Sequence, residues 1–192
     1  MQVPIFPLNT VLFPDGPLPL RVFEPRYLDM VSRCLKTDMP FGVLLIRDGD
    51  EVGMATTYNT GTLARISDWY QGSDGILGVT AIGEQRFRMI ACQRQSDGLN
   101  IGTIELLESE PFVPLPEEFH PLRKILANVL DDLGRLYESQ SRRYDDASWL
   151  TYRFLEVLPI SLTEKQKCLE DNDAAGRLRL IGRLLNTVRE PA

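Results

Sequence analysis

The side chains that could do chemistry in this sequence are one histidine, three cysteines and several neighbouring carboxylates. A Ser–His or Cys–His catalyst would have to use His120, and no residue near it in the sequence would orient its imidazole ring. The cysteines are odd in number and too far apart for a C-x-x-C motif: Cys34, Cys92 and Cys168. We therefore expect a structural or solvated histidine, no metal site and reduced thiols.

Motifs for nucleotide, metal and acyl chemistry are missing as well. The sequence contains no G-x-x-x-x-G-K-[ST], G-x-G-x-x-G, H-E-x-x-H or G-x-S-x-G. Residues 171–176 begin like a calcium loop, but Ala175 and Gly182 stand where oxygen ligands are needed, which predicts a turn and a helix cap instead. These observations argue against an enzyme and predict no cofactor.

A second kind of chemistry is contact with RNA. Arg86 and Arg88 flank Phe87, and Arg94 follows, so basic residues and an aromatic residue lie together. In a strand the two arginines share one face and Phe87 takes the other, where it would join the core. The net charge of −6 disfavours a general nucleic-acid binder, which is usually basic. RNA binding through Arg86, Arg88 and Arg94 therefore stays as the alternative function.

The elements that position these residues begin with proline-punctuated strands. Proline lacks an N–H donor and is confined to strand starts and edges, which predicts short, bent strands of a barrel. Residues 24–36 start with Pro25 near the first turn and carry an apolar stripe at helical spacing, which predicts a short helix. The expected strands span residues 3–6, 10–13, 18–23, 41–47, 60–70, 76–95 as one or two strands with a bend or bulge at Gly83, and 99–108.

After residue 110 the composition changes. We expect a Pro-rich connector over 111–117 and a helical bundle over 118–192. A capping box should start one helix, with Thr163 as the cap and Gln166 at N3, and Asp173 should cap the next. The helices are predicted at residues 119–137, 146–158, 161–170 and 171–185.

The N-terminus and the hydropathy of the chain bear on its compartment. No basic segment followed by an apolar run marks a signal peptide. No stretch approaches the roughly 20 apolar residues that span a bilayer. We therefore expect a cytoplasmic protein that does not contact membranes.

Motifs in a fixed order resemble the N-terminal, substrate-binding domain of Lon protease. The family signature P-L-x-x-x-V-L-F-P, then P-L, then F-E-x-R-Y, is matched at residues 7–14, 19–20 and 23–27. Later family elements are matched by GTLARI at 61–66, DG at 74–75, GEQRFRM at 83–89 and EKQKCLEDNDAAGRLRLI at 164–181. The chain departs from the family at Cys168, where Leu is usual, and at Gly176, where Glu is usual. The ordered set covers essentially the whole chain.

The resemblance implies an α+β fold. A PUA-like β pseudobarrel of about six strands with one short helix would span residues 1–110, and the C-terminal helical bundle would belong to the same Lon-type unit. It also implies a free-standing, non-catalytic binding module without the ATPase and protease domains of Lon. The implied partners are unfolded or flexible polypeptide segments, or a partner protein of the proteolysis machinery, and the chain could form homo-oligomers.

We expect binding in an apolar groove between barrel and helices, or by strand addition at an open barrel edge. The candidate contacts are apolar residues that could instead belong to the core: Phe13, Leu18, Leu20, Phe23 and Tyr27. A structural ion-pair network is expected from Arg21, Glu24 and Arg26. A third class of function, an enzyme or small-molecule binder with an enclosed polar pocket, also stays open.

Overall fold

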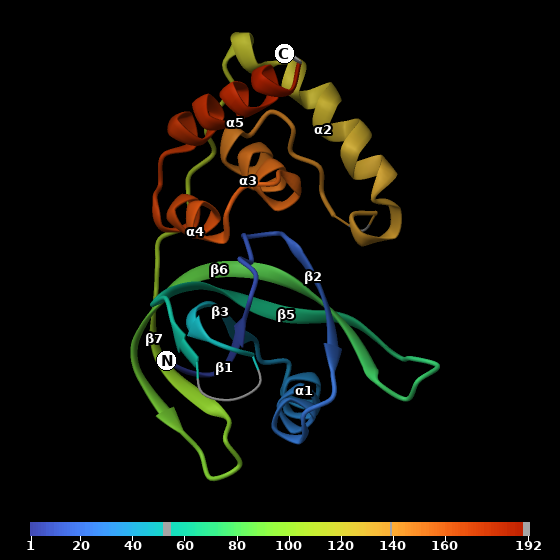
Figure 1. Cartoon of the computed structure of the whole chain (residues 1–192), viewed down its shortest axis with the longest axis vertical. Coiled ribbons are helices and arrows are strands. Elements are labelled where there is room, and N and C mark those ends of the chain that lie inside the picture. Colours follow the sequence, from blue (N-terminus) through green and yellow to red (C-terminus); the bar gives the residue numbers. More distant parts are fainter. Residues whose placement is uncertain (52–54, 139, 190–192) are drawn as a thin grey trace. The chain divides into compact units, whose positions relative to one another are not determined.

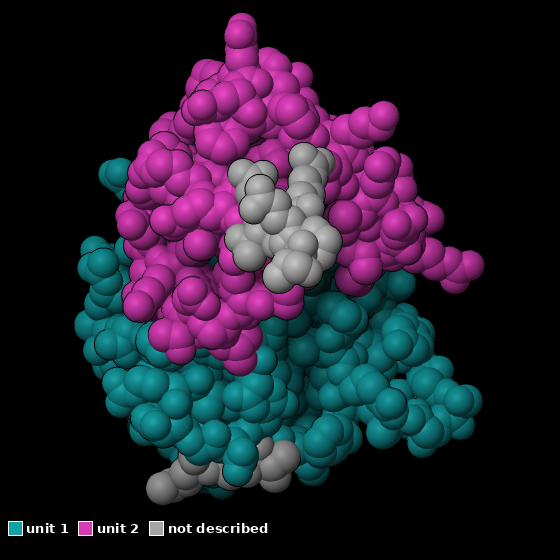
Figure 2. Space-filling model, turned by 45° about the horizontal axis from the view of Figure 1, so that its top comes forward, with its two compact units in different colours: residues 1–109 teal, residues 110–192 magenta. Residues whose placement is uncertain are grey.

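The structure, a computed structural model, describes residues 1–51, 55–138 and 140–189 (Figure 1). The chain divides into two compact units, residues 1–109 and 110–192, which Figure 2 colours separately. Residues 111–117 lie in the second unit, where Pro114 forms an isolated bridge with Asp146 and Leu115 is buried. Each unit has its own hydrophobic cluster of side chains, so each is described by itself.

The described residues of the first unit form a seven-stranded sheet with one helix, α1 (Pro25–Thr37). The sheet order is β1-β7-β6-β5-β3-β4, and a parallel pairing of β1 with β3 closes five of these strands into a barrel (Figure 1). β2 pairs outside this path with one end of the long strand β6. The strands are β1 (Gln2–Leu8), β2 (Pro17–Val22), β3 (Phe41–Gly49), β4 (Ala55–Thr57), β5 (Thr60–Gln71), β6 (Leu77–Arg94) and β7 (Asn100–Leu106).

Strand β1 is apolar on both faces because both faces are covered. Val3 and Ile5 belong to one buried cluster, together with Phe87 of β6. Phe6 and Leu8 point to the opposite face, as strand alternation requires, and join the larger cluster that includes the buried stripe of α1. The stripe of α1 consists of Tyr27, Met30, Val31 and Cys34, whereas the neighbouring Leu35 is exposed.

The expected strand at residues 10–13 was wrong. Residues 11–13 are a buried loop, held by a hydrogen bond from the Thr62 hydroxyl to the Leu12 carbonyl of 2.6 Å. The loop then turns at Asp15, whose φ of 58° is left-handed, and crosses Gly83. The amide of Asp15 donates to the Gly83 carbonyl at 2.7 Å, and a Cβ at residue 83 would lie 2.2 Å from the Phe13 carbonyl oxygen. Gly83 therefore permits a close backbone approach, beside a register shift between β5 and β6.

The second unit is helical. Its helices are α2 (Pro121–Asp132), α3 (Ala147–Val157), α4 (Leu162–Glu170) and α5 (Ala174–Arg189), with short 3-10 turns η1 (Glu117–Phe119) and η2 (Gly134–Leu136). The long helix expected over 119–137 is interrupted, because Gly134 has a φ of 55° and ends the helical path. Residues 147–155 of α3 are all buried, so this helix forms the centre of the unit.

The sequence predicted the capping residues of two helices, α4 and α5. Asp173 caps α5 as expected, because its carboxylate accepts the Gly176 amide at 2.8 Å. The predicted cap Thr163 was wrong: Ser161 caps α4 in a reciprocal capping box with Glu164. Gln166 is not available for capping, because its side chain is buried and donates to Glu170 at 2.7 Å.

Candidate functional site

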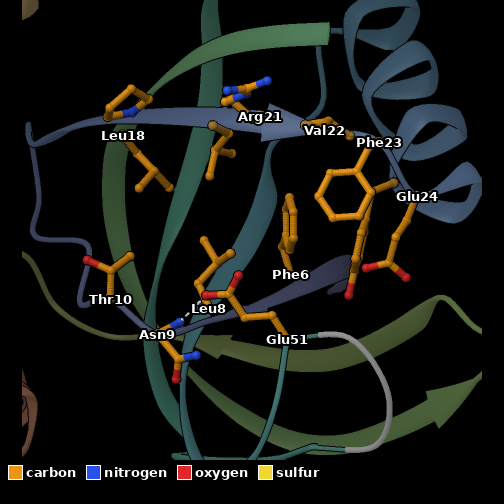
Figure 3. Close-up of a pocket in the computed structure, with 13 residues that line it drawn as sticks. Phe6, Leu8, Asn9, Thr10, Leu18, Arg21, Val22, Phe23, Glu24 and Glu51 are labelled. Carbon is orange, nitrogen blue, oxygen red and sulfur yellow. Dashed lines mark hydrogen bonds between the residues drawn. The ribbon is translucent and has the colours of Figure 1, made fainter. Parts of the chain in front are cut away.

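A pocket of about 460 Å³ lies in the first unit, beside β2, the end of β1 and the start of α1 (Figure 3). This volume is within the range of about 300–1,000 Å³ that is typical of ligand pockets. Its floor is aromatic, because the rings of Phe6 and Tyr27 stack with 4.0 Å between their centroids. Leu8, Leu18 and Leu20 continue the apolar lining.

Phe23 is the exposed apolar residue of this pocket. Strand β2 ends at Val22, which is buried, and α1 begins at Pro25, so Phe23 lies in the two-residue link between them. Its side chain is 60% exposed. Figure 3 shows the ring directed toward the pocket side of β2, and Phe6 lines the same pocket. A side chain of this kind contributes little to the core and is available to a ligand.

Charged side chains fix the rim. Glu24, in the same link, pairs with Arg26 at 2.8 Å, and the Arg26 guanidinium also donates to the Gly98 carbonyl at 3.1 Å. The guanidinium lies 4.6 Å from the centre of the Tyr27 ring, which is a cation–π contact. Burial raises the pKa of the Tyr27 hydroxyl, so this phenol stays protonated at neutral pH.

The expected network of Arg21, Glu24 and Arg26 is only partly formed. Glu24 and Arg26 pair, but Arg21 pairs with Asp74 in the turn between β5 and β6. A hydrogen bond from the Ile76 amide, followed by the charge of Arg21, holds the pKa of the Asp74 carboxyl below its usual value. Figure 3 shows the Arg21 guanidinium pointing away from the pocket. The strand alternation of β2 explains the separation, because Arg21 takes the side of the hairpin turn.

The structure brings four of the five predicted contacts to this pocket: Leu18, Leu20, Phe23 and Tyr27. Phe13 is not among them, because its side chain is fully buried at 0% exposure. Sequence reasoning missed Phe6 and Glu51, which also line the pocket. The alternation of β1 could have suggested Phe6, but the position of Glu51 depends on a loop contact that no local pattern encodes.

The three arginines of the RNA alternative do not form one exposed patch. Arg86 is only 3% exposed, and its guanidinium donates to the Glu108 carbonyl at 3.3 Å. Arg88 is exposed but lies opposite the acidic Glu105 of β7. Arg94 is exposed near the far end of β6, opposite Asn100. Arg86 and Arg88 lie at alternate positions of β6, as expected, but only Arg88 is exposed, and Phe87 between them is buried in the core as expected.

The other residues singled out in the sequence are His120 and the three cysteines. The His120 Nε2 atom lies 3.1 Å from the Leu115 carbonyl oxygen within the second unit. In the part of the chain that the structure describes, no three His, Cys, Asp or Glu side chains are grouped to hold a metal ion. The three cysteines are free thiols. None of the helices in the described ranges has both the length and the apolar character needed to cross a membrane.

Known proteins resemble this chain over nearly its whole length. Residues 2–187 match the family described as the ATP-dependent protease La (LON) substrate-binding domain. Lon protease 2 of Myxococcus xanthus is 26% identical over 196 residues, covering 98% of this chain and 24% of that protein. Protein cereblon of Xenopus tropicalis is 31% identical over 167 residues, covering 84% of this chain and 36% of that protein. The chain thus spans roughly a quarter to a third of these relatives.

Solved structures confirm the expected α+β fold. The crystal structure of a Lon N-terminal domain protein from Xanthomonas campestris superposes with a TM-score of 0.76 at 33% identity, covering 94% of this chain and 96% of that chain. The N-terminal domain of Mycobacterium avium complex Lon protease superposes with a TM-score of 0.64 at 17% identity, covering 96% and 97% respectively. At the lower identity the likeness concerns the fold alone.

Proposed function

Because the chain belongs to the family of Lon substrate-binding domains, we propose that it binds flexible polypeptide segments. An apolar side chain of the bound segment enters the pocket beside β2 and packs against Phe23 and the aromatic floor. The bound segment belongs to a protein that a Lon-type protease degrades, or to a partner protein of that machinery.

The observation that carries this proposal is the exposed Phe23 beside an apolar pocket. Burying one such side chain contributes about 1.5–3 kcal/mol, because its apolar surface leaves water. The stacked rings of Phe6 and Tyr27 give the entering side chain a preformed surface, so little side-chain entropy is lost on binding.

Strand addition at β2 is the weaker route. β2 pairs with β6 on one side, and Pro17 and Pro19 lie at alternate positions along it. Prolines in an edge strand sit where their missing N–H would have faced outward. The open edge of β2 therefore offers few donors to an added strand, which favours side-chain insertion into the pocket.

We also propose that the pocket binds rather than catalyses. Ion pairs hold two of its charged lining groups in place, since Glu24 pairs with Arg26 and Arg21 pairs with Asp74. Tyr27, whose pKa is raised by burial, would be a poor general base at neutral pH. The free thiols suit a reducing compartment, and we propose the cytoplasm as the site of action.

A binding titration tests the function. The purified protein is titrated into a fluorescently labelled, permanently unfolded polypeptide, and anisotropy is measured at about 50 mM and about 500 mM salt. Parallel titrations use single-stranded and duplex RNA. We expect saturable binding to the unfolded chain that persists at high salt, because apolar burial is not screened.

Two results would overturn the proposal. Binding to RNA alone, with affinity that falls steeply with salt, would establish the alternative function. The absence of binding in every arm would show that flexible polypeptide is not the ligand. The same unfolded chain after replacement of its aromatic and large aliphatic residues by serine is the control ligand, and it should not bind.

A further inference from the structure

More acidic than basic side chains line the pocket. Glu24 and Glu51 both line it, and Figure 3 shows their carboxylates on either side of the Phe6 ring in that view. Both charges act on the same phenol: burial raises the pKa of Tyr27 most, Glu24 and Glu51 also raise it, and Arg26 and Arg94 lower it. Among the described lining residues Arg21 is the one cationic side chain, and its guanidinium is held away from the pocket by Asp74.

The two carboxylates differ in how they are compensated. The charge of Glu24 is offset by Arg26 at 2.8 Å. Glu51 is exposed, and its Oε1 atom accepts a hydrogen bond of 2.7 Å from the backbone N–H of Asn9. This bond orients the carboxylate beside the pocket (Figure 3). Among the described residues no lysine or arginine forms an ion pair with Glu51. The uncompensated charge at the rim is therefore negative.

An apolar floor with one uncompensated carboxylate at its rim matches a particular ligand chemistry. A segment with an aromatic or large aliphatic side chain can place that side chain on the floor. A neighbouring lysine or arginine can then reach the Glu51 carboxylate, whereas a neighbouring aspartate or glutamate would meet a like charge. The net charge of −6 acts in the same direction at long range.

We propose that the pocket selects flexible segments in which a large apolar residue lies next to a lysine or arginine, and that Glu51 recognises the positive charge. The inference deepens the proposed function and rests on it. Glu51 is a specificity residue in this scheme, while the apolar floor supplies most of the binding free energy.

Four labelled, end-capped peptides of equal length test this inference. The first three carry one phenylalanine followed by lysine, glutamine or glutamate, and the fourth keeps the lysine but has alanine in place of phenylalanine. Each is titrated against the wild-type protein, Glu51→Gln, Glu51→Lys and Glu118→Gln. The side-chain oxygen of glutamine can still accept the hydrogen bond from the backbone N–H of Asn9, so Glu51→Gln removes the charge with little change in shape. Glu118 is an exposed carboxylate of the second unit and serves as the matched control.

For the wild type we expect the lysine peptide to bind about fivefold more tightly than the glutamine peptide at low salt, with the glutamate peptide weakest. The preference should shrink at about 500 mM salt, vanish in Glu51→Gln, reverse in Glu51→Lys and persist in Glu118→Gln. Equal binding of the three phenylalanine peptides would overturn this inference and leave the proposed function standing. A full preference in Glu51→Gln would overturn the role of Glu51. No binding of any phenylalanine peptide would overturn both proposals.

Discussion

Arg177 and Glu110 form a two-pronged ion pair inside the second unit although 67 residues separate them in the sequence. The guanidinium Nη1 donates to Glu110 Oε1 at 3.0 Å, and the same side chain donates to the Asp171 carbonyl at 2.8 Å and to the Thr151 hydroxyl at 3.0 Å. Both side chains are nearly fully buried. Arg177 therefore joins the first residue of the unit to α3 and α5 through charged hydrogen bonds.

Removing Arg177 should strongly destabilise the second unit. Arg177→Ala leaves the Glu110 charge buried without its main partner, which typically costs about 3–5 kcal/mol. Urea unfolding followed by the fluorescence of Trp149, which is buried in this unit, measures the loss in a Trp69→Phe background. The control is Arg179→Ala on the same helix, because Arg179 is 65% exposed and its pair with Asp173 should contribute less than about 1 kcal/mol. Equal losses in both variants would contradict this assignment.

The free energy of unfolding should depend on pH through the ionisation of Glu156. Burial raises the pKa of this carboxyl from 4.5 to about 7, against the opposing charge of Arg153 at 2.6 Å. The folded state therefore holds a proton that the unfolded state releases, so the contribution of Glu156 to stability is fully present below pH 4.5 and is lost as pH rises to about 7. The loss should approach about 3 kcal/mol, since each pKa unit corresponds to about 1.4 kcal/mol.

The matching variant is Glu156→Gln, which cannot ionise. Its stability should be nearly flat between about pH 5 and pH 8, measured by the same tryptophan fluorescence. Glu118→Gln should retain the wild-type slope. Glu110 should act in the opposite sense: burial raises its pKa, but hydrogen bonds from Arg177 and Tyr152 outweigh this and hold it below 4.5. Its contribution is thus lost only as pH falls below that value. A wild-type slope in Glu156→Gln would disprove the assignment.

Phe23→Asp should abolish binding of unfolded polypeptide without unfolding the protein. The residue is exposed, so its replacement should change stability by no more than about 0.5 kcal/mol, while binding would lose the apolar ring and would have to desolvate a carboxylate at the mouth of the pocket. Anisotropy titration and thermal unfolding measure the two effects. Phe112→Asp is the matched control, because Phe112 is 64% exposed but lies in the second unit. A drop in stability that parallels the loss of binding would identify Phe23 as a packing residue.

Two glycines of the first unit should respond differently to alanine. Gly83→Ala would place a methyl group 2.2 Å from the Phe13 carbonyl oxygen, and a backbone atom cannot easily move aside, so we expect a loss above about 2 kcal/mol. Gly75→Ala meets no atom within 4 Å and should lose only the cost of its positive φ of 79°, about 1 kcal/mol. Thermal unfolding by circular dichroism compares the two. If Gly75→Ala were the more damaging variant, the close approach at Gly83 would not be what that residue serves.

Local sequence patterns predicted which segments form helices and strands. They were less able to predict what surrounds a particular side chain. The stripe of α1 followed from the spacing of Tyr27, Val31 and Cys34, and β6 falls within the strand segment expected over 76–95. The apolar residues 11–13 fitted a strand equally well, but their burial comes from contacts with Thr62 and Gly83 far along the chain. Sequence reasoning could not distinguish them from a strand.

The same limit explains the outcome at the candidate site. Leu18, Leu20, Phe23 and Tyr27 line one pocket because β2 and α1 follow each other directly in the chain. Phe13 was grouped with them on composition, yet the loop that carries it turns inward before β2 begins. Arg86 was a candidate for an RNA-binding surface, but its side chain is buried and its guanidinium donates to the Glu108 carbonyl, a contact between β6 and the segment after β7 that no local pattern encodes.

The pairing of β1 with both β3 and β7 has a consequence during synthesis. β1 spans Gln2–Leu8, and β7 ends at Leu106, so the barrel cannot close until the ribosome has released nearly the whole first unit. At about 5–20 residues per second, the edge of β1 that pairs with β7 waits roughly 5–20 s for that strand, whereas β3, on the other edge, follows sooner. Pro4 and Pro7 interrupt its backbone donors during that interval. The prolines thus act as gatekeepers that hinder cross-chain β pairing before the native partner strand arrives.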